Sequence, residues 1–215
     1  MMIRCVFTIL AAIGLQGCGG GATSGAAGDA MVQYHSDTVV VDGAGVQVLG
    51  PLGMIDLGTP DWQGDDAKTS GPTLSYVMTR HPDYFVVAGQ DQGIGFHGVA
   101  GALSDGFGNR PVAYQAQIQI MSGQSSLTHP VTLTVNTNWD VPRVLGGIPE
   151  LGVDIFADLE ITGEFTGRVG YRQSWANLQG GVFSGDPLTH GAYIAGGFSG
   201  DQFYGMITGT KSDDP

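Results

Sequence analysis

The stretch Val153-Asp-Ile-Phe-Ala-Asp-Leu-Glu-Ile-Thr-Gly-Glu-Phe165 alternates strictly between two kinds of residue. Every odd-numbered position is apolar or glycine, whereas four of the six residues between them are acidic. Because successive side chains of a β-strand point to opposite faces, the pattern predicts one thirteen-residue strand with a buried face and a solvent face. At ~3.3 Å per residue, such a strand is about 40 Å long, which is typical of a tilted barrel strand.

The same alternation recurs along the chain from residue 74 onward. Tyr114, Ala116, Ile118 and Ile120 alternate with glutamines, and no stretch shows a convincing helical stripe of useful length. Further strands are predicted at 74–80, 84–88, 94–103, 168–176, 180–184, 190–198 and 203–210, joined by residues that favour turns. The sequence therefore predicts an all-β fold: an eight-stranded antiparallel up-and-down β-barrel with an apolar interior, over residues 74–215.

Residues 32–73 are predicted to form a small N-terminal β extension. Thr38–Val41 and Val46–Leu49 flank the turn-forming sequence Asp42-Gly-Ala-Gly45, which indicates a hairpin. The stretch from Pro51 to Pro72 is rich in proline, glycine and aspartate, and we expect an irregular loop there.

The first 17 residues have the parts of an export signal. Arg4 is followed by an apolar run from Val6 to Leu15, which is too short to span a bilayer. The run ends in Leu15-Gln-Gly-Cys18, which resembles the lipobox of bacterial lipoproteins. That resemblance implies cleavage between Gly17 and Cys18 and attachment of lipid to Cys18. The alternative is an ordinary signal peptide in which Cys18 is incidental.

Residues 18–31 are dominated by glycine, alanine and other small residues, and they predict a flexible tether behind the anchor. Cys5 and Cys18 are the two cysteines of the sequence, so a processed chain would have no disulfide and no zinc–thiolate site. The net charge of −12 repels phosphate backbones, and we expect no nucleic-acid partner. Carboxylates at this density also keep a secreted domain soluble, and the functional alternative is a partner with a basic face, or a cation.

A short repeat places a phenylalanine among glycines. Gly181-Val-Phe-Ser-Gly-Asp186 recurs as Gly196-Gly-Phe-Ser-Gly-Asp201, and Gly163-Glu-Phe-Thr-Gly167 is a looser copy. In each copy we expect the ring to fill a narrow barrel interior while the glycines leave room for it.

These glycine and aromatic patterns resemble the lipobarrel family, which comprises transferrin-binding protein B and its single-barrel lipoprotein relatives. The resemblance covers roughly residues 84–211. It rests on Ile94-Gly-Phe-His-Gly98, Pro111-Val-Ala-Tyr-Gln115, Asp158-Leu-Glu-Ile-Thr-Gly163, and the segment from Gly196-Gly-Phe-Ser-Gly200 to Gly205-Met-Ile-Thr-Gly-Thr-Lys211.

The resemblance implies an eight-stranded barrel held by a lipid anchor at the outer membrane of a Gram-negative bacterium. Members of the family capture host proteins or iron-related cargo through their loops. This chain has one predicted barrel, so transferrin binding itself is not implied. The expectation is a monomeric lipoprotein that binds a protein or a small ligand, iron-related cargo included.

The candidate ligand-binding loop is residues 138–152, the longest turn-rich connection between strong strands. Within it, Trp139, Asp140 and Arg143 are the candidate contacts, because an exposed tryptophan or arginine is a frequent anchor in interfaces. We expect no metal and no cofactor, since the five histidines lack the spacing of metal ligands.

Two other functions stay open at this point. An integral eight-stranded outer-membrane barrel would show the same alternation, although a lipid at Cys18 would then be a redundant anchor. An enzyme is disfavoured because no nucleophile–base pair is evident. It would require His97 and His190 to converge beside a carboxylate.

Overall fold

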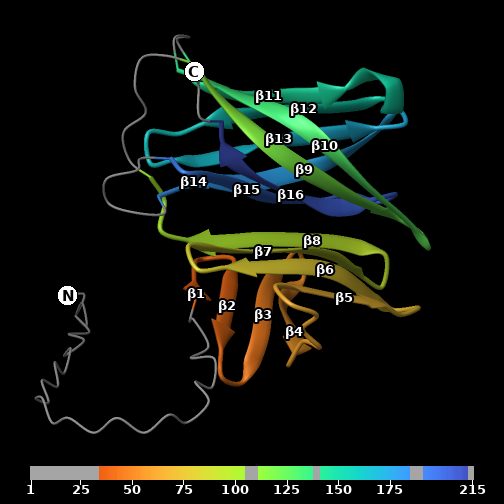
Figure 1. The fold of residues 1–215 in the computed structure, drawn as a ribbon. Helices are drawn as coiled ribbons and strands as arrows, with labels where there is room; N and C mark the ends of the chain where they lie inside the picture. Colours follow the sequence, from red (N-terminus) through yellow and green to blue (C-terminus); the bar gives the residue numbers. More distant parts are fainter. Residues whose placement is uncertain (1–33, 105–110, 138–140, 185–190, 213–215) are drawn as a thin grey trace, which may run out of the picture. The chain divides into compact units, whose positions relative to one another are not determined.

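The computed structural model describes residues 34–104, 111–137, 141–184 and 191–212, all within one unit, Met31–Pro215. In the described ranges, the regular elements are β-strands apart from one short 3-10 turn, η1 (Pro149–Leu151). They form two four-stranded sheets and a closed barrel (Figure 1). The all-β prediction is therefore confirmed.

The first sheet has the order β1-β2-β3-β4 and the second the order β5-β6-β7-β8. Their strands are β1 (Tyr34–His35), β2 (Val39–Asp42), β3 (Gly45–Gly50), β4 (Gly53–Gly58), β5 (Asp66–Ser70), β6 (Leu74–His81), β7 (Tyr84–Asp91) and β8 (Ile94–Gly101). The predicted hairpin around residues 42–45 is confirmed as β2 and β3, with Val41 opposite Val46.

The barrel contains eight antiparallel strands, each paired with its neighbour in the chain. They are β9 (Val112–Ser122), β10 (Ser125–Asn136), β11 (Arg143–Ile148), β12 (Val153–Leu159), β13 (Glu164–Tyr171), β14 (Ser174–Phe183), β15 (Tyr193–Ser199) and β16 (Tyr204–Lys211). The last strand pairs with the first, with Ile207 opposite Ile118, and this pairing closes the cylinder. The predicted eight-stranded up-and-down barrel is confirmed.

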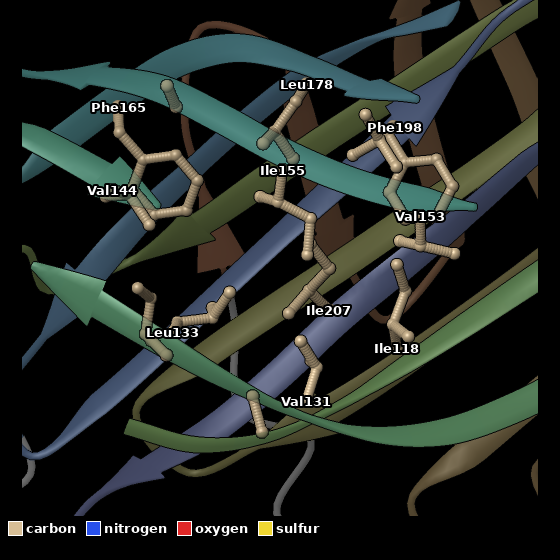
Figure 2. Packing of buried hydrophobic residues seen from close by; sticks show 14 of the residues in the cluster. Ile118, Val131, Leu133, Val144, Val153, Ile155, Phe165, Leu178, Phe198 and Ile207 are labelled. Carbon is tan, nitrogen blue, oxygen red and sulfur yellow. The ribbon is translucent and has the colours of Figure 1, made fainter. Parts of the chain in front are cut away.

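Apolar side chains fill the barrel. Ile118, Leu133, Ile155, Phe165 and Phe198 come from five different strands and are almost completely buried in one cluster. Figure 2 shows these side chains pointing toward one another between the strands. An eight-stranded barrel is just wide enough for side chains to fill, so this interior is a packed core, as predicted.

The sheet β5–β8 is buried on both of its faces. On one face, Phe85, Val87 and Phe96 pack with residues of the β1–β4 sheet such as Val48. On the other face, apolar side chains of the same sheet, such as Val86, pack against the outside of the barrel, which contributes Met206. The chain therefore forms three layers: the β1–β4 sheet, the β5–β8 sheet and the barrel (Figure 1).

The three repeat phenylalanines take two different positions. Phe165 and Phe198 lie in the barrel interior, as predicted. Phe183 instead lies outside the barrel and stacks on Tyr84 of β7, with ring centroids 5.4 Å apart. The prediction of an interior ring was therefore wrong for Phe183, because the repeat does not reveal that a second sheet covers this part of the barrel.

The predicted single strand of residues 153–165 was wrong in one respect. It is a hairpin of β12 and β13, with a turn at residues 160–163 in which Ile161 is 87% exposed. Leu159 and Phe165 are directly opposite each other across the hairpin. Opposite residues of antiparallel strands point to the same face, so the alternation continues unchanged through this turn. The alternation therefore could not reveal that the strand ends there.

The predicted barrel boundary at residue 74 was also wrong. Strands β6, β7 and β8 belong to the second sheet, and the barrel begins at Val112. The predicted loop from Pro51 to Pro72 contains β4 and β5. Alternation shows that a segment is a strand, whereas the sheet that a strand joins depends on residues far away in the sequence.

Candidate binding surface

The predicted contact residues are only partly described. Gly17, Cys18, Trp139 and Asp140 lie outside the described residues. Arg143 is not in a loop: it begins β11, a strand of six residues that lies within the predicted loop 138–152. Its Nε is 3.4 Å from Asp158 Oδ1, and its guanidinium carbon is 4.8 Å from the ring centroid of Phe156. These contacts hold Arg143 against β12, and its role in ligand binding stays a prediction.

The outer face of the barrel is polar where no other layer covers it. Gln115 and Gln117 of β9, Thr132 of β10, and Asp154 and Asp158 of β12 are exposed there. A barrel that crosses a membrane needs an apolar band about 25 Å tall on its outside. These side chains do not form such a band, and they count against the integral membrane alternative. In the described ranges, no helix is both long and apolar enough to span a bilayer.

A groove follows the free edge of β8, and we call it the β8 groove. One cavity of about 430 Å³ lies beside Ile94 to His97, and another of about 270 Å³ lies beside Val99 to Leu103. Thr38 and Gln179 line both cavities. The groove therefore runs between the β1–β4 sheet on one side and barrel strand β14 on the other.

A partly buried polar pair lies in the larger cavity. His97 Nδ1 is 2.7 Å from Ser199 Oγ, and this hydrogen bond joins β8 to barrel strand β15. Burial lowers the pKa of His97 to about 4 from the usual 6.5, so the ring is neutral at pH 7. Gln90 makes a second link between the layers, donating from Nε2 to the Gly200 carbonyl at 2.8 Å.

The hydroxyl–imidazole pair does not amount to a catalytic triad in the part of the chain that the structure describes. No carboxylate is hydrogen-bonded to the His97 ring there, although a triad requires one to orient the base. No group of three or more histidine, cysteine or acidic side chains lies close enough to hold a metal ion in the described ranges. His190, the other histidine of the enzyme hypothesis, lies outside them.

Exposed apolar side chains gather at one end of the groove. Leu49, Leu52 and Met54 belong to the hairpin of β3 and β4, and Ile94 begins β8. Leu52, Met54 and Ile94 surround a further cavity of about 200 Å³, which shares Pro51 and Ile94 with the larger cavity. We call these four exposed residues the apolar rim. Its most exposed member is Leu52, at 86%.

The groove and the rim carry negative charge. Asp37 and Glu164 line the smaller cavity of the groove, Asp201 lines the larger one, and Asp91 lines the cavity beside the rim. Among the described residues, no lysine or arginine lines any of these three cavities. The surface is therefore apolar at one end and acidic along its length.

Sequence reasoning missed this surface, although one signal was present. Leu49-Gly-Pro-Leu-Gly-Met54 places three large apolar residues in a glycine- and proline-rich turn, where polar residues are the norm. The free edge of β8 could not be predicted in this way, because an edge strand and a central strand can have the same sequence pattern.

No family model and no curated protein matches the chain. Among solved structures, it is similar to HpuA of Kingella denitrificans in complex with human haemoglobin, with 13% identity, a TM-score of 0.49, and 79% of this chain and 77% of that chain covered. A structure described as a surface lipoprotein gives 11% identity and a TM-score of 0.45, with 85% of this chain and 97% of that chain covered.

Transferrin binding protein B of serogroup B Neisseria meningitidis is also similar, with 10% identity and a TM-score of 0.41. That match covers 78% of this chain and 39% of the other, so this chain spans well under half of that protein. The resemblance to transferrin-binding protein B is thus confirmed as a structural likeness. All three TM-scores lie below 0.5.

Proposed function

We propose that this chain is a lipid-anchored lipoprotein of a Gram-negative outer membrane that works as a binding module rather than an enzyme. Its partner is a protein that docks on the apolar rim. One observation carries the proposal: Leu49, Leu52, Met54 and Ile94, from two separate hairpins, expose their side chains around adjoining cavities. Clustered exposed apolar residues beside a concave surface mark interaction sites on soluble domains.

The charge of the surface defines the kind of partner. Asp91 and Asp201 lie beside the rim, and the whole chain has a net charge of −12. A partner with basic residues around an apolar contact is complementary to this surface, and opposite charges accelerate association. Binding to such a partner is expected to weaken at high salt, because salt screens charges that are exposed.

The test of the docking surface uses two matched variants of the full chain purified in mild detergent. Leu52→Asp places a charge in the apolar rim, whereas Ile161→Asp places one at a similarly exposed apolar residue, 87% exposed, in the β12–β13 turn. Serum proteins and bacterial envelope proteins are captured on each variant and on the parent chain. A partner captured by the parent and by Ile161→Asp but lost with Leu52→Asp supports the proposal, and equal capture by all three contradicts it.

The lipid anchor needs its own test. Cells expressing the parent chain or Cys18→Ser are fed an alkyne-tagged palmitate, and their membranes are washed with alkaline carbonate. We expect label on the parent alone, and release of the Cys18→Ser chain by the wash. A Cys18→Ser chain that stays in the washed membrane would instead support the integral barrel.

A further inference from the structure

We propose that the β8 groove binds an extended, basic peptide segment, which adds a strand to the free edge of β8. This inference rests on the proposed function and specifies how the partner is recognised. Strand β8 is the last strand of its sheet, paired with β7 alone. An extended peptide that pairs with such an edge gains main-chain hydrogen bonds, and the neighbouring pockets select its side chains.

The direction of the free backbone groups follows from two observations. Strands β7 and β8 are joined by the two-residue turn Gln92-Gly93, both of which have positive φ, as in a type I′ hairpin. In addition, the Val99 carbonyl accepts a hydrogen bond from Ser36 Oγ at 2.9 Å, so it points away from β7. Backbone groups of an antiparallel strand alternate in direction, so those of Gly95 and His97 also point away from β7, into the groove.

These groups have no partner among the described residues. No backbone or side-chain group there is hydrogen-bonded to the main chain of Gly95 or His97 on the free side. The bond from Ser36 Oγ to the Val99 carbonyl shows that a donor can reach this edge. Further along, Leu103 forms a β-bridge with Phe183 of the barrel, which ends the groove. From Gly95 to Gly101 the edge is roughly 20 Å long, and along it an added strand would have to replace the bond from Ser36 Oγ to the Val99 carbonyl.

The walls of the groove favour one added strand rather than a whole sheet. The connection between β1 and β2 contributes Thr38 on one side, and β14 contributes Gln179 on the other. An edge recessed between two layers cannot pair with the edge of another folded sheet, which is how natural proteins limit aggregation at free edges. A single extended chain can still enter, because cavities of about 430 and 270 Å³ lie along the edge.

The charge of the groove sets the composition of the peptide. Asp37, Glu164 and Asp201 line it, and lysine and arginine are absent from its described lining. A bound strand would present lysine or arginine to these carboxylates. Its apolar residues would meet Leu49 and Ile94 at the end near the rim. Alternating basic and apolar residues suit this lining, because successive side chains of a strand point to opposite faces.

The test begins with the full chain in mild detergent and a phage-displayed random heptapeptide library. Peptides that bind are synthesised, and amide hydrogen exchange of the protein is followed by NMR. We expect the amides of Gly95, His97 and Val99 to exchange about tenfold more slowly with a peptide at about ten times its Kd. Those of Phe96, Gly98 and Ala100, which face β7, should already exchange slowly without the peptide, because they pair with β7 in the free protein. This difference between alternate residues is specific to strand addition.

Two matched substitutions accompany this measurement. Gln179→Trp places a bulky ring between the two cavities, whereas Gln117→Trp makes the same change on the exposed outer face of β9. We expect the first to weaken peptide binding at least tenfold and the second to leave it unchanged. Selected peptides rich in lysine or arginine would support the charge argument.

Three outcomes overturn the proposal: a library without binders, binders that leave the three amides unprotected, and protection that rises with protein concentration alone, which would indicate pairing between two copies. The two proposals fail in different ways. If a partner is lost with Leu52→Asp but bound normally by Gln179→Trp, the apolar rim is supported as the docking surface and strand addition to β8 is contradicted. A partner unaffected by Leu52→Asp removes the proposed function itself.

Discussion

Lowering the pH from 7 to 5 is expected to destabilise this protein through His97. The neutral ring lies partly buried between β8 and the barrel, where loss of solvent lowers its pKa to about 4, against 6.5 for the usual histidine. Between these two values the unfolded chain binds a proton that the folded chain does not. The free energy of unfolding is therefore unaffected by this group above pH 6.5, and it falls as the pH drops toward 4.

The two pKa values set the size of the effect. Between pH 7 and pH 5, the difference in proton uptake corresponds to a loss of about 2 kcal/mol in the free energy of unfolding. Because the His97 side chain is only partly buried, solvent relieves part of the cost of charging it, so about 2 kcal/mol is an upper limit.

The assay is urea unfolding at both pH values, with the parent chain and His97→Gln compared under the same conditions. Glutamine keeps a group that can hydrogen-bond to Ser199 Oγ and does not titrate. The variant should lose less stability than the parent between pH 7 and pH 5, by up to about 2 kcal/mol. Equal losses in the two proteins would refute the reasoning, since the titration would then come from other groups.

Three further substitutions test the packing. Phe165→Ala should cost about 3–5 kcal/mol in urea unfolding, because it leaves a cavity in the closed barrel core; a loss below about 1 kcal/mol would mean that the interior collapses freely. Gly163→Ala should also destabilise, since Gly163 has a φ of +88° and an added Cβ would lie 2.5 Å from the Ser104 carbonyl oxygen; an unchanged melting temperature would contradict this. Arg168→Ala should cost about 0.5–1 kcal/mol and change the fluorescence of Trp175, whose ring centroid lies 4.4 Å from the guanidinium carbon; an unchanged spectrum would argue against that stacking.

Much of the barrel could be predicted because its signal is local. The alternation around Ile118, Leu133 and Ile155 identified both the strands and the side chains that fill the interior. A closed barrel buries one face of each strand, and this leaves a pattern that repeats every second residue. Turn residues such as Gly93 also marked the ends of several strands.

The errors came from features that this pattern does not encode. The turn near Ile161 preserved the alternation, so two strands read as one. Strands β6 to β8 read like barrel strands, although they form a separate sheet that is covered on both faces. Phe183 has the same local sequence as Phe198 but packs on the outside of the barrel.

The sequence by itself determined that this chain is all-β and which faces of most strands are apolar. Only the tertiary structure decided which strands share a sheet, that the edge of β8 lies open in an acidic groove, and that Leu52 and Ile94 meet at its end. The physical reason is the separation in sequence between the residues that interact. Alternation records whether a side chain faces water or core, whereas pairing and docking depend on contacts between residues far apart in the chain.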